Sequence, residues 1–147
     1  MLCREEGLAL SDLAAHPDQL LAGFGLFGTI KETNVDDKGL EDFTGFFPHP
    51  LYKDVNLDFY NALGNRKLKL PWNPWTIFKG LFWIRSIQSR LKAKNIEGNL
   101  VGEGLTKGGV IIFGKDRLPK YAYAEETGEE LPLADILAAV EAVKRGD

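Results

Sequence analysis

Short apolar strand patterns alternate with amphipathic helix patterns along this chain of 147 residues, and this alternation limits the folds open to it. Residues 4–15 have helical spacing, whereas residues 24–30 are apolar and bounded by glycine, as in a buried strand. The next expected elements are a helix near 36–43, a strand at 51–54, a helix of 56–63 capped by Asn56, and a helix of 74–91. A hairpin of 110–113 with 121–124 around the turn from Gly114 to Pro119 and a last helix from Pro132 up to Gly146 are expected after them. This order predicts an α/β protein with a mixed sheet, a C-terminal β-hairpin and a final helix.

The first expected helix has no strand in front of it. An α/β fold of this size usually leads into such a helix from a central strand. We therefore expect the fold to lack its N-terminal strand here, with Met1 an internal start or a truncation point. We find no repeat, low-complexity segment or linker, so residues 1–147 are expected to form a single domain.

Composition excludes several classes of protein. Hydrophobic residues make up 44% of the chain and charged residues 27%, which is typical of a globular domain. The most apolar stretch, from Trp75 to Ile87, is interrupted by Lys79 and Arg85, so no integral membrane segment is expected. The N-terminus lacks the pattern of a secretory signal, which makes the cytoplasm the expected location. Two histidines and one cysteine do not supply the clustered spacing of a metal site, and neither a metal nor a cofactor is expected.

Basic residues gather in the middle of the chain, although its formal net charge is −3. No acidic residue lies between Phe59 and Ile96, and the helix expected from Pro74 also carries several aromatic residues. Packing against the sheet is the commoner fate of such a helix. The rival interpretation is a non-catalytic module whose aromatic and basic helix contacts a protein partner or the surface of a membrane. Nucleic-acid binding is not expected, because the chain is acidic and carries no signature of a known module.

The single cysteine, Cys3, stands at the N-terminus of the first expected helix. Unpaired backbone N–H groups and the positive end of the helix dipole stabilise a thiolate there and lower the pKa of the thiol. Glu5 and Glu6 lie in the same turn and favour the neutral thiol, while Arg4 offsets one of them. The sequence leaves the direction of the net pKa shift open. Cys3 is the candidate nucleophile and Arg4 its nearby positive charge, and the alternative is an unreactive thiol close to the chain terminus.

Neither histidine is placed by the sequence as a clear partner for this thiol. His16 is near the far end of the first helix, about 20 Å from Cys3 at 1.5 Å per residue. His49 is left as a less favoured member of a Cys–His nucleophile pair.

Five glycines lie in one short segment between Gly98 and Gly109. Glycine lets backbone N–H groups approach an anion, but the spacing of a phosphate-binding loop is absent. A tight loop that passes close to the redox site, or packs on the sheet, is the favoured interpretation.

Short motifs spread over nearly the whole chain occur in an order known from one family. They are Cys3-Arg4-Glu5-Glu6 with Leu10-Ser11-Asp12-Leu13, then Asp42-Phe43, Leu51-Tyr52-Lys53-Asp54 and Phe59-Tyr60, and finally Gly98-Asn99-Leu100-Val101-Gly102-Glu103-Gly104 with Gly108-Gly109-Val110. In combination they resemble the peroxiredoxin-like two family, thioredoxin-fold proteins of the AhpC/TSA antioxidant group. The resemblance implies a thioredoxin-like three-layer sandwich.

The resemblance also implies a thiol-dependent antioxidant or redox-regulatory function. Such a protein reduces peroxide or disulfide substrates and is recycled by an external dithiol reductant. Family members carry Cys-x-x-Cys, of which Cys3 matches the second cysteine, and the first would fall immediately before Met1. The chain cannot close a dithiol cycle by itself, and it has no proline just before Val110, where thioredoxin folds place a cis-proline. Whether it is an active enzyme therefore stays open here. The expected neighbours of the site are Glu103, Gly104, Gly108 and Gly109.

Overall fold

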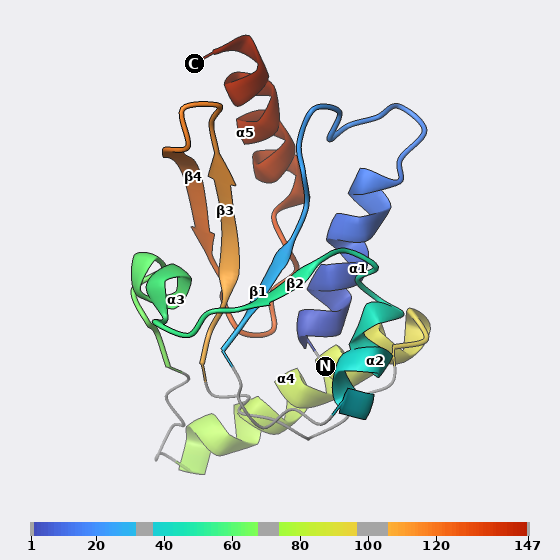
Figure 1. The fold of residues 1–147 in the computed structure, drawn as a ribbon. Coiled ribbons are helices and arrows are strands. Elements are labelled where there is room, and N and C mark those ends of the chain that lie inside the picture. The colour runs from blue at the N-terminus through green and yellow to red at the C-terminus, as the bar shows by residue number, and fades with distance from the viewer. Residues whose placement is uncertain (1, 32–36, 68–73, 97–105, 147) are drawn as a thin grey trace.

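The computed structural model describes residues 2–31, 37–67, 74–96 and 106–146 (Figure 1). Its helices are α1 (Leu2–Ala14), α2 (Asp37–Thr44), α3 (Asp58–Ala62), α4 (Pro74–Ala93) and α5 (Leu133–Arg145). Its strands are β1 (Gly28–Ile30), β2 (Leu51–Lys53), β3 (Gly109–Phe113) and β4 (Pro119–Ala124). Helices and strands are mixed along the chain, as the sequence predicts.

The strands form two separate sheets within the residues that the structure describes. β1 pairs in parallel with β2, with Gly28 opposite Leu51, and α2 makes the crossover between them. β3 and β4 form an antiparallel hairpin in which Val110 lies opposite Tyr123. The single mixed sheet expected from the sequence is not formed there, because no described strand lies between the two pairs to hydrogen-bond both.

The last helix covers the hairpin and supplies the best-buried part of the core. Ile136 and Val140 on α5 are each only 2% exposed, and they cluster with Ile112 of β3 and Leu131. Their spacing of four residues places both side chains on one face of the helix. The helix ends at Gly146, which adopts the left-handed conformation with φ 89°, so the expected C-terminal helix is confirmed.

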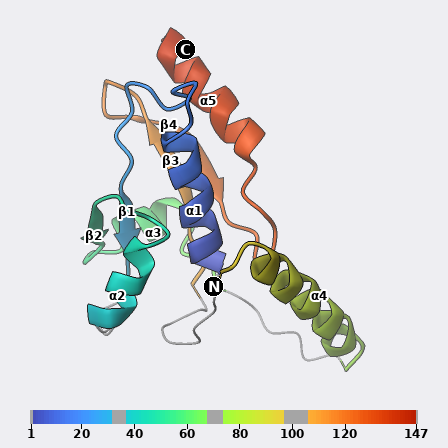
Figure 2. The same cartoon turned by 90° about the vertical axis from the view of Figure 1, so that its right-hand side faces the viewer.

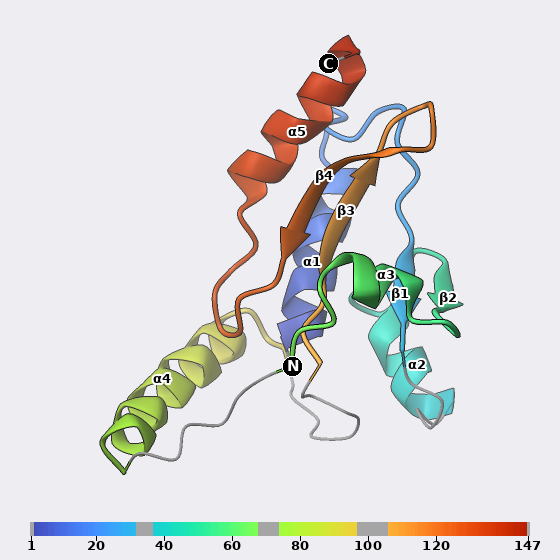
Figure 3. The same cartoon turned by 90° about the vertical axis from the view of Figure 1, so that its left-hand side faces the viewer.

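A second apolar cluster attaches α4 to the rest of the molecule. Ile87, Leu91 and Ile96 are buried and pack against Leu8 of α1 and Phe46. The helix extends away from the remaining elements, as Figures 2 and 3 show from two sides. Among the described residues, none of the helices combines the length and the apolar character that crossing a bilayer requires.

Aromatic rings connect the two sheets. The ring centroids of Phe27 and Phe59 lie 6.4 Å apart, and those of Phe59 and Phe113 lie 6.3 Å apart, both in edge-to-face geometry. Because these residues come from the segment before β1, from α3 and from β3, the two strand pairs are held together through side chains.

Two local expectations were wrong. Asn56 was expected to cap α3, but the carboxylate of Asp54 accepts hydrogen bonds from the backbone N–H groups of Asp58 at 2.8 Å and Phe59 at 2.9 Å. A carboxylate provides two strong acceptors to the unpaired N–H groups of a helix start, so it replaces the nearer amide. Pro119 was expected in the hairpin turn, but it is the first residue of β4, a position where its missing N–H costs no ladder bond.

Candidate functional site

Cys3 lies in the first turn of α1 and is exposed. The helix therefore begins where the sequence predicts, and the cysteine lies at the surface. Unpaired N–H groups at a helix start favour a thiolate. Whether they prevail over the surrounding carboxyl groups depends on what else the fold brings to this end of α1.

The surroundings of Cys3 favour the neutral thiol. Although the residue is exposed, the protein around its sulfur removes part of the water that would stabilise a thiolate, and this desolvation raises the pKa of the thiol from its ordinary value of 9.0. The carboxyl groups of Glu6 and Glu125 raise this pKa further, while the residue's own backbone N–H lowers it. The direction that the sequence left open is thus upward, and Cys3 is protonated at neutral pH.

Glu6 lies on the same face of α1 as Cys3, three residues further along. Its side chain is half-buried, and desolvation together with the charges of Glu125 and Glu5 raises its pKa from 4.5 to about 8. A carboxyl group with this pKa carries a proton at neutral pH. It can donate that proton to a group that becomes negative beside it.

Glu125 reaches this end of α1 from the residue that follows β4. It is buried, and its carboxylate accepts a hydrogen bond at 2.8 Å from the backbone N–H of Gly108. In return the backbone N–H of Glu125 donates to the carbonyl of Gly108 at 3.0 Å, and Arg66 donates to the carbonyl of Glu125 at 2.6 Å. These bonds fix the Glu125 carboxylate in the position from which it raises the pKa of both Cys3 and Glu6.

Arg4, which the sequence suggests as the positive charge beside the sulfur, has two described contacts with α2 and the residues after it. The buried Arg4 side chain lies 3.9 Å from the carboxylate of Asp42 and 5.1 Å from the ring centre of Phe46. Successive residues of a helix point in directions about 100° apart, which explains why the neighbour of Cys3 in sequence faces another element. Arg4 therefore anchors the start of α1 against α2 and the residues that follow it.

Glu5 ties the same turn of α1 to the C-terminal end of α4. The Glu5 carboxylate is 6% exposed and accepts hydrogen bonds from Arg90 Nε at 2.9 Å, Arg90 Nη2 at 3.0 Å and Lys94 Nζ at 2.6 Å. Burial alone would raise the pKa of Glu5, but these bonds prevail and hold it below 4.5. Glu5 and Glu6 are thus neighbours with opposite protonation states at neutral pH.

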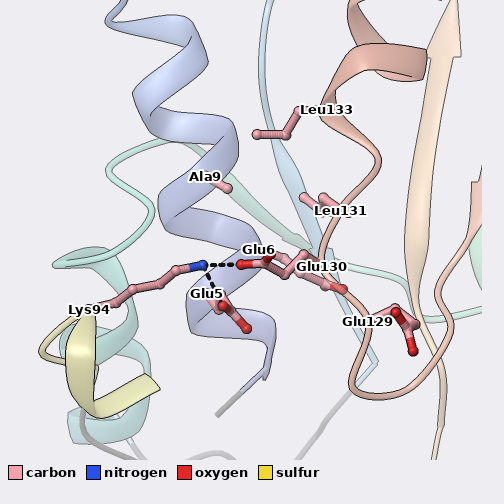
Figure 4. A pocket seen from close by; sticks show the side chains of 8 residues that line it. All are labelled: Glu5, Glu6, Ala9, Lys94, Glu129, Glu130, Leu131 and Leu133. Carbon is pink, nitrogen blue, oxygen red and sulfur yellow. Dashed lines mark hydrogen bonds and ion pairs between the residues drawn. The ribbon is translucent and has the colours of Figure 1, made fainter. Parts of the chain in front are cut away.

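A cleft of about 130 Å³ opens between α1, the end of α4 and the segment before α5. Figure 4 shows Lys94 reaching across it to both Glu5 and Glu130. The cleft is lined by Glu5, Glu6, Ala9, Lys94, Glu129, Glu130, Leu131 and Leu133. Because Glu6 shares a helix face with Cys3, the cleft begins one helical turn from the candidate sulfur.

The other predicted site residues have mixed outcomes. Glu103 and Gly104 lie outside the described residues. Gly108 is connected to the neighbourhood of Cys3 through Glu125, whereas Gly109 begins β3 and approaches the backbone of Tyr123 so closely that a side chain would not fit. His49 packs edge-on against Phe47 at 4.9 Å and is not among the groups that most affect the Cys3 pKa. In the part of the chain that the structure describes, no three His, Cys, Asp or Glu residues are grouped as metal ligands.

The sequence did not indicate that Glu6 is a proton carrier, and it did not indicate that Glu125 belongs to the site at all. The spacing of three between Cys3 and Glu6 could have indicated that they share a helix face. No local signal marks Glu125, because it enters the site through hairpin packing more than 100 residues later in the chain.

The profile of the family described as AhpC/TSA antioxidant enzyme matches residues 9–127, a span that does not include Cys3. The chain belongs to the AhpC/TSA antioxidant family. The resemblance seen in its motifs is thereby confirmed, and an α/β thioredoxin-like fold and a redox-related function are consistent with this membership. No solved structure matches the chain.

Individual relatives cover almost all of the chain. It is 34% identical to Peroxiredoxin-like 2A of Gallus gallus over an alignment of 147 positions, which covers 97% of this chain and 60% of the relative. It is 31% identical to Prostamide/prostaglandin F synthase of Bos taurus over 146 residues, covering 95% of this chain and 68% of the relative. The chain thus spans 60% of the length of the chicken protein, so activities of the whole relatives do not pass to it directly.

Proposed function

We propose that this chain is a thiol-dependent antioxidant domain in which Cys3 is the redox-active residue. Membership in the AhpC/TSA family supports redox chemistry. The observation that carries the proposal for this residue is the exposed position of Cys3 beside Glu6, a carboxyl group that is protonated at neutral pH. The sulfur and a proton donor thus lie on one face of α1.

The proposed substrates are peroxides and disulfides, in agreement with the peroxiredoxin-like name of one set of relatives. With a peroxide, the thiolate of Cys3 attacks one oxygen, an S–O bond forms and the O–O bond breaks. The leaving oxygen takes a proton and departs as water or an alcohol, so the peroxide is reduced and Cys3 is oxidised to a sulfenic acid. One thiol of an external dithiol then displaces water to give a mixed disulfide, and the second thiol releases Cys3.

Glu6 is the proposed proton donor for the leaving group. The thiol must first lose its own proton, and its raised pKa makes that step unfavourable at neutral pH. A leaving alkoxide or thiolate gains a proton more readily when a neutral carboxyl lies next to it. We therefore expect the attack to be slow at neutral pH and to accelerate as the thiolate fraction rises. Gly108 takes part indirectly, by holding Glu125.

We also propose that the protein acts in the cytoplasm, where dithiol reductants are present, and that its fold is the thioredoxin-like three-layer sandwich that its family resemblance implies. Arg4 serves this site by fixing the start of α1 through Asp42 and Phe46.

The test is peroxide consumption by the reduced chain in the presence of a small dithiol, comparing the natural protein with Cys3→Ser. The natural protein should consume peroxide above background and trap dimedone at Cys3 as the sulfenic acid adduct, and the variant should do neither. Urea unfolding establishes that the variant is folded. If Cys3→Ser retains the full rate, or if no adduct forms during turnover, Cys3 is not the reacting residue.

A further inference from the structure

The inner side of α4 is fully engaged by the rest of the molecule. Ile87 and Leu91 are buried, and Arg90 and Lys94 are bound to Glu5. Trp83 lies directly against the backbone of Gly128. Positions 83, 87, 90 and 94 recur at helical spacing, so these contacts define one side of the helix.

The outer side of α4 has a different character. Phe82 is 62% exposed and Ile84 is 45% exposed, and Arg85 and Lys92 are exposed as well. Phe82, Arg85 and Lys92 follow one another at spacings of three and seven residues, so at about 100° per residue they spread over about 80° of the helix circumference, with Phe82 at one edge. Ile84 lies at the opposite edge, about 100° from Arg85, so the two cations lie between the two apolar side chains. The outer side therefore combines two large apolar side chains with two cations.

The charge on this outer side is uncompensated. The α4 sequence contains neither aspartate nor glutamate. Arg85 and Lys92 form no ion pair with the residues that the structure describes, whereas Arg90 and Lys94 are neutralised on the inner side by Glu5 and Glu130. A cationic strip thus lies on a chain whose formal net charge is −3. The surface that complements this cationic strip in charge is an anionic one.

We propose that the outer side of α4 binds to the surface of an anionic lipid membrane. A surface helix that combines exposed Phe and Ile with Arg and Lys can insert the apolar side chains at the level of the headgroups while the cations meet lipid phosphates. The helix extends away from the body of the molecule (Figures 2 and 3), and Phe82, Ile84, Arg85 and Lys92 on its outer side are exposed. The binding is peripheral and independent of the chemistry proposed for Cys3.

The experiment is co-sedimentation of the full chain with vesicles of phosphatidylcholine alone or mixed with phosphatidylserine, at low and at high salt. The chain should bind only the mixed vesicles, and high salt should weaken the binding, because exposed charges are screened. One basic residue near such a surface contributes about fivefold in affinity, so Arg85→Glu with Lys92→Glu should weaken binding at least tenfold. Phe82→Ser with Ile84→Ser should weaken it as well.

Matched controls come from the tip of the β-hairpin and from the turn after β2. Lys115→Glu with Arg117→Glu makes the same charge change on exposed residues, and Leu118→Ser with Val55→Ser removes side chains that are 60% and 76% exposed. Both control pairs should leave vesicle binding unchanged. All these residues are exposed, so each variant should fold, which circular dichroism and urea unfolding verify.

Three outcomes would overturn the proposal. The first is that the natural chain fails to bind the mixed vesicles at low salt or binds both kinds of vesicle equally. The second is that the controls lose as much binding as the α4 variants. The third is that the natural chain self-associates, that Phe82→Ser with Ile84→Ser dissociates it, and that neither form binds vesicles. This result would show that the outer side of α4 contacts a second copy of the chain.

Discussion

The guanidinium of Arg90 and the carboxylate of Glu5 form a two-pronged ion pair, with Nε donating to Oε1 at 2.9 Å and Nη2 donating to Oε2 at 3.0 Å. The residues are 85 positions apart in sequence. The same Arg90 Nη2 also donates to the carbonyl of Gly128 at 3.0 Å, so one side chain joins the first turn of α1, the end of α4 and the segment before α5. The element that carries Cys3 is thus held through this junction.

Removing the Glu5 carboxylate should cost far more stability than removing an exposed carboxylate. Glu5→Ala leaves Arg90 and Lys94 with the more exposed Glu130 as a carboxylate partner, and losing hydrogen bonds to a charged group typically costs about 1.5 to 3 kcal/mol. The control is Glu141→Ala, whose exposed pair with Lys144 three residues away is worth about 0.5 kcal/mol or less. Urea unfolding at neutral pH measures both. Equal losses in the two variants would mean that the Glu5 junction is not an important source of stability.

Glu6 should make the folded chain less stable as the pH rises. Its pKa is about 8 in the folded protein and about 4.5 when unfolded, so between these values only the folded state holds the proton. The contribution of Glu6 is fully present below about pH 4.5 and is lost as the pH rises to about 8. The loss should amount to a few kcal/mol.

Glu6→Gln is the variant that isolates this effect, because glutamine resembles the protonated carboxyl but does not titrate. The variant should match the natural chain near pH 5 and exceed it in stability near pH 9, as measured by urea unfolding at each pH. Asp12→Asn, on an exposed position of α1, serves as control. A natural chain with the same pH profile as Glu6→Gln would show that Glu6 ionises normally.

The Glu125 carboxylate should suppress the reactivity of Cys3. Because it raises the pKa of the thiol, Glu125→Gln should lower that pKa and shift the pH profile of iodoacetamide alkylation toward neutral pH. The natural chain should label slowly at pH 7 and faster as the pH rises above 9. The Asp12→Asn variant should follow the natural profile. If Glu125→Gln leaves the profile in place, the carboxylate does not act on the sulfur.

Gly128 should tolerate substitution much less than Gly146, although both have φ of 89°. A Cβ at Gly128 would overlap the indole ring of Trp83 and come within 2.8 Å of Ile87 Cδ1, whereas nothing lies within 4 Å of the same atom at Gly146. Gly146→Ala should therefore cost about 1 to 2 kcal/mol for the left-handed backbone alone. Gly128→Ala should cost at least about 2 kcal/mol more, because Trp83 must move. Thermal or urea unfolding of the two variants gives the difference directly, and equal costs would contradict the close contact of Trp83 with Gly128.

Local sequence patterns predicted much of the secondary structure. Apolar residues at helical spacing predicted α1, α4 and α5, and alternation around a turn predicted the β3–β4 hairpin. Helix caps were predicted less well. Asp54 caps α3 in place of the expected Asn56, because a cap depends on which acceptor the backbone brings within reach of the helix start. The expected single sheet also depends on contacts between distant strands, which no local pattern contains.

The sequence by itself determined that a lone cysteine stands at the start of a helix with two glutamates in the same turn, and that its motifs belong to one antioxidant family. It could not determine the charge state of that turn. The tertiary structure made Glu5 an ionised partner of Arg90 and Glu6 a neutral carboxyl, and it brought Glu125 to Cys3. The physical reason is that a pKa depends on desolvation and on charges in space, and folding alone decides which distant groups share that space.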